Sequence, residues 1–273
     1  MAIKLMYITN KAEIAQIAEN VGVDRIFVDL ETVGKQARQG GMDTVQSHHS
    51  LDDIAEIKSV LKTAELLVRS NPIYENSENE IETIVKNGAD IVMLPYFKTC
   101  GEVLKFLELV GGRARTCLLF ETPEAVEKAD EIIELPGVDE VFIGLNDLSL
   151  GYGKKFMFEL LTDGTVERLS EKFKKKDIPF GFGGIAALGC GMLPSEYIIC
   201  EHYRLGSGAA ILSRSFCNCD KISDLSEIQK IFVGGLAQIR SFEKRCALYN
   251  AAAFADNYRE IQRRVKIICE DIK

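Results

Sequence analysis

Short apolar runs recur along the chain, and each is followed by a stretch with the residue spacing of a helix. Apolar and polar residues do not alternate within the runs, which is typical of parallel strands buried on both faces. Eight strand–helix alternations in 273 residues predict an α/β fold, as a (β/α)8 TIM barrel rather than an open sheet. The predicted strands are residues 4–8, 25–31, 65–69, 90–95, 117–120, 141–144, 179–184 and 203–212.

The pattern changes after residue 220, where two long helical segments, 225–248 and 251–272, follow without a strand between them. We therefore expect a barrel over residues 1–220 and a C-terminal helical extension over 221–273. The extension is either part of the same domain or a contact in a homo-oligomer formed through the C-terminal helices. Within the barrel, one helix is expected over about residues 155–176.

Composition narrows the classes of partner. The chain is 47% hydrophobic and carries a net charge of −8, so we expect neither nucleic acid nor an anionic membrane as a partner. No apolar run is long enough to cross a bilayer, and the first ten residues lack a secretory signal. Its eight scattered cysteines suit reduced thiols in the cytoplasm. The close pair Cys217 and Cys219 lacks the further ligands of a zinc site, and we interpret it as structural.

Two predicted strands run directly into carboxylates, Glu121 after residues 117–120 and Asp147 after 141–144. A buried carboxylate is costly unless something neutralises it. Two of them at equivalent strand ends indicate a shared divalent cation with oxygen ligands. Alternatively, Glu121 caps the following helix and Asp147 caps a turn.

Catalytic residues of such a barrel lie at the carboxyl ends of its strands, where this chain also has Asp29, Glu31 and Arg69. Arg69 ends an apolar strand, and a guanidinium there is suited to a substrate oxygen that gains negative charge, such as an enolate. Its alternative role is an ion pair with Asp29 or Glu31. These three residues are the predicted catalytic groups.

The same strand ends supply candidate substrate contacts. Pro95 ends the fourth strand, and Gly144 and Asn146 offer backbone N–H groups to a small carboxylate beside Asp147. Among the three histidines, His48 and His49 lie on a polar, Gly-rich loop that is long enough to carry function, whereas His202 is expected to make a structural hydrogen bond.

Five segments of the chain resemble the HpcH/HpaI aldolase and citrate lyase β-subunit family of the pyruvate/phosphoenolpyruvate barrel superfamily. They are residues 27–31, 68–71, 90–95, 120–125 and 137–149. The resemblance covers about residues 20–153 in order and at the spacing of the family. The last segment is the most specific, because its glycine, acid, leucine and serine stand where the family has its metal-binding loop.

The resemblance implies a divalent cation, Mg²⁺ first and Mn²⁺ or Co²⁺ next, held by Glu121 and Asp147. It implies a carbon–carbon lyase of the class II pyruvate aldolase kind, acting on a small 2-oxo acid such as pyruvate or oxaloacetate, with Arg69 stabilising the enolate. The second partner would be an aldehyde or an acyl-CoA. Exchange of C-terminal helices between subunits would explain the segment after residue 220.

The chain departs from the aldolase pattern at two positions: Thr32 stands where those aldolases have a histidine, and Leu119 where they tend to have glutamine. The acids of residues 29–31, with Lys35 and Arg38 after them, are closer to the lyase β-subunit branch. Two alternatives therefore stay open, a citryl- or malyl-CoA-type lyase and an inactive barrel used for binding or assembly. A further possibility is a phosphate bound at residues 181–184 and 213–215, meaning a phosphorylated second substrate.

Overall fold

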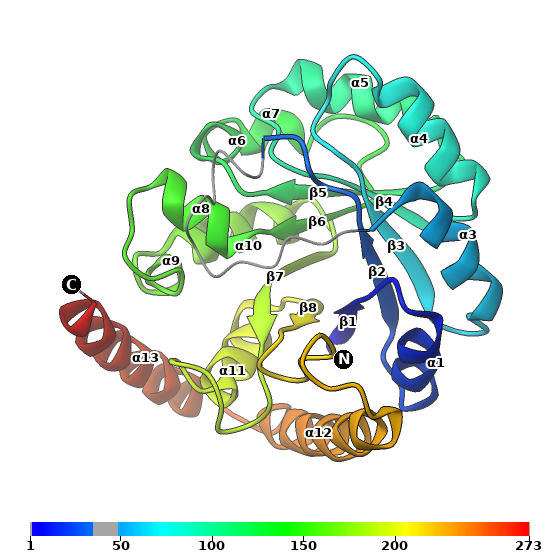
Figure 1. Cartoon of the computed structure of the whole chain (residues 1–273). Helices are drawn as coiled ribbons and strands as arrows, with labels where there is room; N and C mark the ends of the chain where they lie inside the picture. The colour runs from blue at the N-terminus through cyan, green and yellow to red at the C-terminus, as the bar shows by residue number, and fades with distance from the viewer. Residues whose placement is uncertain (1, 35–48, 273) are drawn as a thin grey trace.

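The computed structural model describes residues 2–34 and 49–272. In these two ranges, eight parallel strands close into a barrel in the order β1 to β8, with helices around the outside (Figure 1). The predicted (β/α)8 barrel is confirmed. The strands are β1 (Lys4–Ile8), β2 (Arg25–Asp29), β3 (Glu65–Arg69), β4 (Ile91–Leu94), β5 (Arg115–Phe120), β6 (Glu140–Ile143), β7 (Phe180–Ile185) and β8 (Ala209–Leu212).

Several helices begin at a residue whose side chain caps the first turn. Ser50 and Asp53 form a capping box at one helix, and the Thr99 side chain accepts a hydrogen bond from the Glu102 N–H at another. The helices of the described ranges are α1 (Ala12–Asn20), α3 (Leu51–Val60), α4 (Ser77–Lys86), α5 (Cys100–Val110), α6 (Pro123–Glu127), α7 (Ala129–Ile132), α8 (Leu145–Gly151), α9 (Glu159–Thr162), α10 (Thr165–Lys175), α11 (Ser195–Leu205), α12 (Leu225–Cys246) and α13 (Ala251–Asp271).

Most predicted strands match within two residues at each end, but two predicted elements differ by more, and a left-handed glycine explains each. The single helix expected over residues 155–176 is divided into α9 and α10, because Gly164 has a φ of 82° and no helix continues through that conformation. The predicted eighth strand starts too early. Tyr203 belongs to α11, which ends at Gly206 with a φ of 77°, and the strand begins only at Ala209.

The interior of the barrel is layered. Its middle layer is apolar and separates a charged layer at the amino ends of the strands from another at the carboxyl ends. The middle layer consists of Met6, Phe27, Leu67, Ile91, Met93, Cys117, Leu119, Phe142 and Ala209. Because strand side chains alternate in direction, Arg25 and Asp29, two positions before and after Phe27 on β2, fall in the charged layers on either side of this apolar one.

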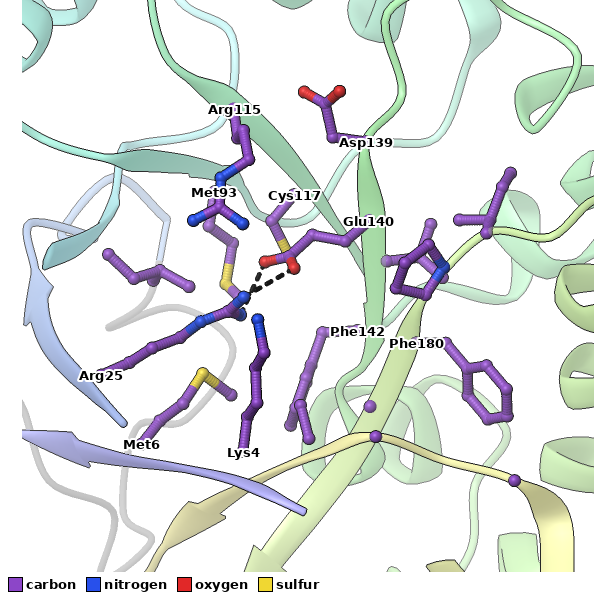
Figure 2. A pocket seen from close by; sticks show the side chains of 18 of the residues that line it. Lys4, Met6, Arg25, Met93, Arg115, Cys117, Asp139, Glu140, Phe142 and Phe180 are labelled. Carbon is purple, nitrogen blue, oxygen red and sulfur yellow. Dashed lines mark hydrogen bonds and ion pairs between the residues drawn. The ribbon is translucent and has the colours of Figure 1, made fainter. Parts of the chain in front are cut away.

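The charged layer at the amino ends lines a cavity of about 390 Å³. Figure 2 shows Arg25 reaching Glu140, with hydrogen bonds of 2.7 and 2.8 Å from its two Nη atoms, and Arg25 Nε also donates to Glu65 at 2.9 Å. Arg115 makes a second ion pair with Glu65. The charges here neutralise one another and close the base of the barrel, at the end opposite to that used for catalysis in such folds.

The C-terminal helices lie against the barrel (Figure 1). Helix α12 packs on α1 and α11, and α13 packs on α11 and α9. Arg240 of α12 pairs with Asp24 at 2.8 Å, and the Glu243 carboxylate accepts a hydrogen bond from the Ile3 N–H at 2.7 Å. The extension therefore contributes to the fold of this chain, while its expected contact with a second subunit stays a prediction.

The described ranges contain no helix that is long and apolar enough to cross a membrane. All eight cysteines are free thiols in the structure. The expected cytoplasmic location stays a prediction.

His202 has the structural role expected of it. Its ring is fully buried and stacks on Phe182 with 3.8 Å between ring centres, and its Nδ1 lies 2.7 Å from the Ser207 hydroxyl. Burial lowers the pKa of His202 to about 3, well below its ordinary value of 6.5.

This burial predicts a pH dependence of stability. Between pH 6.5 and 3 the unfolded chain binds a proton at His202 that the folded chain does not. The free energy of unfolding should therefore fall as the pH drops below 6.5, by on the order of 1.4 kcal/mol per pH unit from this group. Urea unfolding of the wild type and of His202→Gln at pH 5 to 7 measures the difference in slope. Carboxylates titrate equally in both proteins, so equal slopes would contradict the prediction.

Candidate active site

Arg69 is held by the two carboxylates predicted beside it. Asp29 and Arg69 are register partners at the ends of β2 and β3. Arg69 Nε and Nη2 donate to the two Asp29 carboxylate oxygens, each at 2.8 Å, and Nη1 lies 3.3 Å from Glu31 Oε2. Asp29 also accepts a hydrogen bond from the Glu31 N–H at 3.1 Å, which fixes the two acids relative to each other.

The guanidinium stays charged in this setting. Burial alone would lower the pKa of Arg69, but the carboxylates of Asp29, Glu31 and Glu121 more than offset it and raise the pKa above its ordinary value. The fork on Asp29 uses two of the five N–H groups, Nη1 adds an ion pair with Glu31, and the remaining N–H groups make no hydrogen bond to a described residue. The ion pair considered as an alternative role is thus present, and donors remain for a substrate.

Glu121 and Asp147 lie at the neighbouring strand ends, as predicted. Glu121 follows β5 and is buried, and Asp147 is buried in the first turn of α8 after β6. Glu121 Oε1 accepts a hydrogen bond from the Tyr96 N–H at 2.9 Å. A Cβ at Gly144 would lie 2.8 Å from Glu121 Oε2, so glycine at this position leaves the space that the carboxylate fills.

The electrostatics of Glu121 indicate how closely these charges gather. Burial and then the negative charge of Glu31 raise the pKa of Glu121 well above its usual range. Asp147 raises it further, whereas Arg69 and the Tyr96 N–H lower it. Buried acids that repel one another are a setting that a divalent cation stabilises.

A hard divalent cation fits this donor set. Mg²⁺ is commonly bound by one or two carboxylates and completes its coordination with water and substrate oxygens. No group of three or more histidine, cysteine or acidic side chains in the described ranges is arranged to hold a metal. Glu121 and Asp147 would therefore supply two ligands, and the remainder of the coordination shell would come from the substrate and water.

The alternative that Glu121 caps a helix is wrong. The Thr122 hydroxyl caps α6 by accepting from the Ala125 N–H at 3.1 Å, and Pro123 is the first residue of that helix. The proposed donor role of the Gly144 N–H is also wrong, because that group donates to the Phe120 carbonyl at 3.0 Å in the barrel wall. The substrate contact expected of Asn146, the second residue of α8, stays a prediction.

The residue after Pro95, and not Pro95 itself, makes the contact with Glu121. Pro95 is buried at the end of β4, and Tyr96 after it has a left-handed backbone with a φ of 48°. This unusual conformation for a residue other than glycine directs the Tyr96 N–H to Glu121. Direct contact between Pro95 and a substrate stays a prediction.

A cavity of about 430 Å³ opens beside Arg69 between the ends of β1, β2, β3 and β8. Asp29, Arg69 and His49 line it, together with Arg214 from the segment after β8. His49 Nδ1 accepts a hydrogen bond from the Asp29 N–H at 2.9 Å. An accepting Nδ1 means a neutral ring whose proton sits on Nε2.

The predicted functional loop covers residues 34–50. His48, Lys35 and Arg38 lie outside the described residues. Thr32 is exposed, and Asn71 Oδ1 accepts hydrogen bonds from the N–H groups of Thr32 and Val33 at 2.8 and 2.9 Å. Asn71 thus fixes the chain where it leaves β2.

The residues considered for a phosphate site do lie together. A Cβ at Gly184 of β7 would be 3.6 Å from the Ser213 Cβ, and both Ser213 and Arg214 line the cavity beside Arg69. The loop after β8 therefore brings a cation close to the predicted enolate site. Phosphate binding itself stays a prediction.

Comparisons with known proteins identify the family and support the fold. A family model described as HpcH/HpaI aldolase/citrate lyase matches residues 4–159. No curated protein sequence matches the chain significantly. An HpcH/HpaI aldolase from Desulfitobacterium hafniense DCB-2 is similar in structure, at 17% identity and a TM-score of 0.61, over 88% of this chain and 93% of that one.

Two further solved structures share the fold. One is an HpcH/HpaI aldolase/citrate lyase family protein from Burkholderia cenocepacia J2315, with 13% identity, a TM-score of 0.62, and coverage of 84% of this chain and 95% of that chain. The other is the citrate synthase SbnG, with 14% identity, a TM-score of 0.58, and coverage of 88% and 94%. At such identities the likeness demonstrates the architecture alone.

Proposed function

Because the chain belongs to the HpcH/HpaI aldolase/citrate lyase family, we propose that it is a divalent-cation-dependent carbon–carbon lyase acting on a small 2-oxo acid of the pyruvate or oxaloacetate type. Family membership supports a lyase or aldolase type of activity. The observation that carries the finer proposal is the gathering of Arg69, Glu121 and Asp147 at the carboxyl ends of β3, β5 and β6, with Asp29 and Glu31 beside them.

In this proposal each charged residue has a separate task. Glu121 and Asp147 would hold the cation, which when bound would act as a Lewis acid on the oxygens of the 2-oxo acid. Arg69 would present N–H groups that Asp29 does not use to the oxygen that becomes negative as the enolate forms. Asp29 and Glu31 are positioning residues, since they hold the guanidinium and neutralise it in the resting site.

Thr32, at the position expected for histidine, cannot act as a base at neutral pH. A histidine does reach the site, and we assign His49 the role of a hydrogen-bond donor to the substrate. His49 lines the same cavity as Arg69, and its neutral ring carries a proton on Nε2. In that form the Nε2–H group can donate a hydrogen bond to a substrate oxygen as negative charge develops on it.

The second substrate would enter through the cavity next to Arg69. Arg214 at its wall favours an anionic partner, either a phosphorylated or carboxylated aldehyde or the thioester of coenzyme A. Both alternatives use the same enolate site. Cleavage assays with malyl- or citryl-type thioesters, compared with aldol substrates, would distinguish them.

Oxalate tests the site without a choice of second substrate, since it is a planar dianion with the oxygen arrangement of the pyruvate enolate. We expect calorimetry to show oxalate binding only with Mg²⁺ or Mn²⁺ present. Two carboxylates alone bind a cation weakly, so oxalate should raise the affinity of the protein for Mn²⁺. Because binding is reciprocal, Mn²⁺ should raise the affinity for oxalate by the same factor. Equal oxalate affinity with and without cation would overturn the proposal.

A further inference from the structure

A pair of thiols lies at the wall of the cavity, apart from the residues assigned to the enolate site. Cys217 and Cys219 come from the segment after β8, and their Sγ atoms are 3.6 Å apart. The Tyr7 hydroxyl, from β1, lies 3.0 Å from Cys219 Sγ and donates to the Cys217 carbonyl at 3.1 Å. Both cysteines and Tyr7 line the cavity that Arg69 and Asp29 also reach.

The two thiols differ in access. Cys217 is buried, whereas Cys219 is partly exposed beside Asn218 and Asp220. Lys11 also lies here, with its Nζ 3.4 Å from the Cys219 carbonyl and 3.9 Å from Asp220. Cys219 is thus the thiol that a reagent entering the cavity meets, and Cys217 lies directly behind it.

The surroundings of Cys219 favour its thiolate. The hydrogen bond from Cys217 lowers the pKa of Cys219 to about 7; Tyr7 and Lys11 act in the same direction, against burial and Asp220. The hydrogen bond with Cys219 and burial raise the pKa of Cys217. A thiol with a pKa close to ambient pH is the most effective attacking group in thiol–disulfide exchange.

We propose that Cys219 and Cys217 form a thiol–disulfide exchange site, with Cys219 as the attacking thiol and Cys217 as the resolving thiol, for small disulfides of the glutathione class. The proposal rests on the distance between the sulfurs, on their place at an open cavity and on the donors around Cys219. It replaces the purely structural role inferred from the sequence, and it does not depend on the lyase activity.

The exchange balances in two steps. The Cys219 thiolate attacks one sulfur of the small disulfide, which forms a mixed disulfide and releases one small thiol. The Cys217 thiol then loses its proton and attacks the Cys219 sulfur, which forms the bond between Cys217 and Cys219 and releases the second small thiol. The protein dithiol loses two electrons and two protons, and the small disulfide gains both.

A second pair of cysteines provides an internal comparison. Cys200 of α11 and Cys246 of α12 have Sγ atoms only 3.3 Å apart, closer than those of the first pair. Both are buried in the packing between the helices, so a reagent in solvent does not reach them. If the distance between the sulfurs alone decided reactivity, Cys200 and Cys246 would form a disulfide first. If solvent access and thiolate character decide it, Cys217 and Cys219 would form a disulfide first.

The test treats the folded protein with glutathione disulfide, stops the reaction with acid and maps the cysteines by mass spectrometry. In the wild type we expect a disulfide between Cys217 and Cys219, with Cys200 and Cys246 still reduced. Cys217→Ser should stop at one glutathionyl group on Cys219, and Cys219→Ser should leave Cys217 unmodified. The exposed Cys190 gives the rate of an ordinary surface thiol in the same sample.

The hydroxyl of Tyr7 gives a finer test. Tyr7→Phe removes a donor to Cys219, so the thiolate fraction falls and exchange at Cys219 should slow by about threefold, since lower thiolate content is partly offset by higher nucleophilicity. The rate at Cys190 should not change. The proposal would be overturned if Cys219 in the wild type reacted no faster than Cys190, or if Cys217→Ser gave no mixed disulfide at Cys219.

Discussion

Glu121→Gln should abolish the binding of divalent cations and lower metal-dependent turnover by about 10³-fold, because the Lewis acid supplies several kcal/mol. The amide has the shape of the carboxylate and can still accept the hydrogen bond from the Tyr96 N–H. It also removes the repulsion of Glu121 by Glu31 and Asp147. We therefore expect the variant to be folded and at least as stable as the wild type.

Titration with Mn²⁺, followed by electron paramagnetic resonance, measures the loss of binding, and urea unfolding measures stability. Glu124→Gln is the matched control. Glu124 lies three residues further along the chain but is exposed and pairs with Lys98 at 2.9 Å on the surface. Its replacement should leave Mn²⁺ binding unchanged. Unchanged Mn²⁺ stoichiometry in Glu121→Gln would remove this residue from the cation site.

Arg69→Gln should cost both activity and stability. Without the guanidinium, the buried carboxylates of Asp29 and Glu31 lose their cation, which for a buried pair costs about 3–5 kcal/mol. Enolate formation should slow by about 10²–10³-fold, as on removal of an oxyanion-stabilising group. Urea unfolding and the rate of enolisation measure the two effects separately.

Two further variants separate the roles of the Arg69 charge. Combining Asp29→Asn with Arg69→Gln removes one of the stranded acids and should recover part of the lost stability while enolisation stays slow. Arg113→Gln is the control, since Arg113 pairs with Glu82 at the surface and should cost well under about 1 kcal/mol. Recovery of enolisation in the double variant would contradict a role of Arg69 at the enolate.

The sequence reveals this site because the architecture fixes it. Parallel strands without alternation predict a barrel, and a barrel places Asp29, Arg69, Glu121 and Asp147 at one end of the molecule. The family resemblance, which is confirmed by the match over residues 4–159, adds the same residues in the same order. Local sequence patterns are thus enough to predict candidate site residues when these residues lie at the ends of strands.

Other parts of the site depend on backbone geometry and tertiary contacts that no local pattern encodes. The left-handed conformation of Tyr96 is imposed by its surroundings, since its side chain gives no reason for it. The sequence suggests Gly144 as an N–H donor to the substrate. In the structure, its lack of a Cβ instead leaves room for the Glu121 carboxylate. Tyr7 meets Cys219 across more than 200 positions of chain, a contact that only closure of the barrel between β1 and β8 creates.

The most direct test of the central claim is the exchange of pyruvate methyl protons with deuterated water, followed by NMR, because it reports enolisation alone. We expect exchange in the presence of Mg²⁺, Mn²⁺ or Co²⁺, none with a chelator, and a loss of the metal-dependent rate in Arg69→Gln and Glu121→Gln. An absence of exchange with any of these cations, in a protein that still binds Mn²⁺, would contradict the claim that this barrel forms the enolate of a small 2-oxo acid.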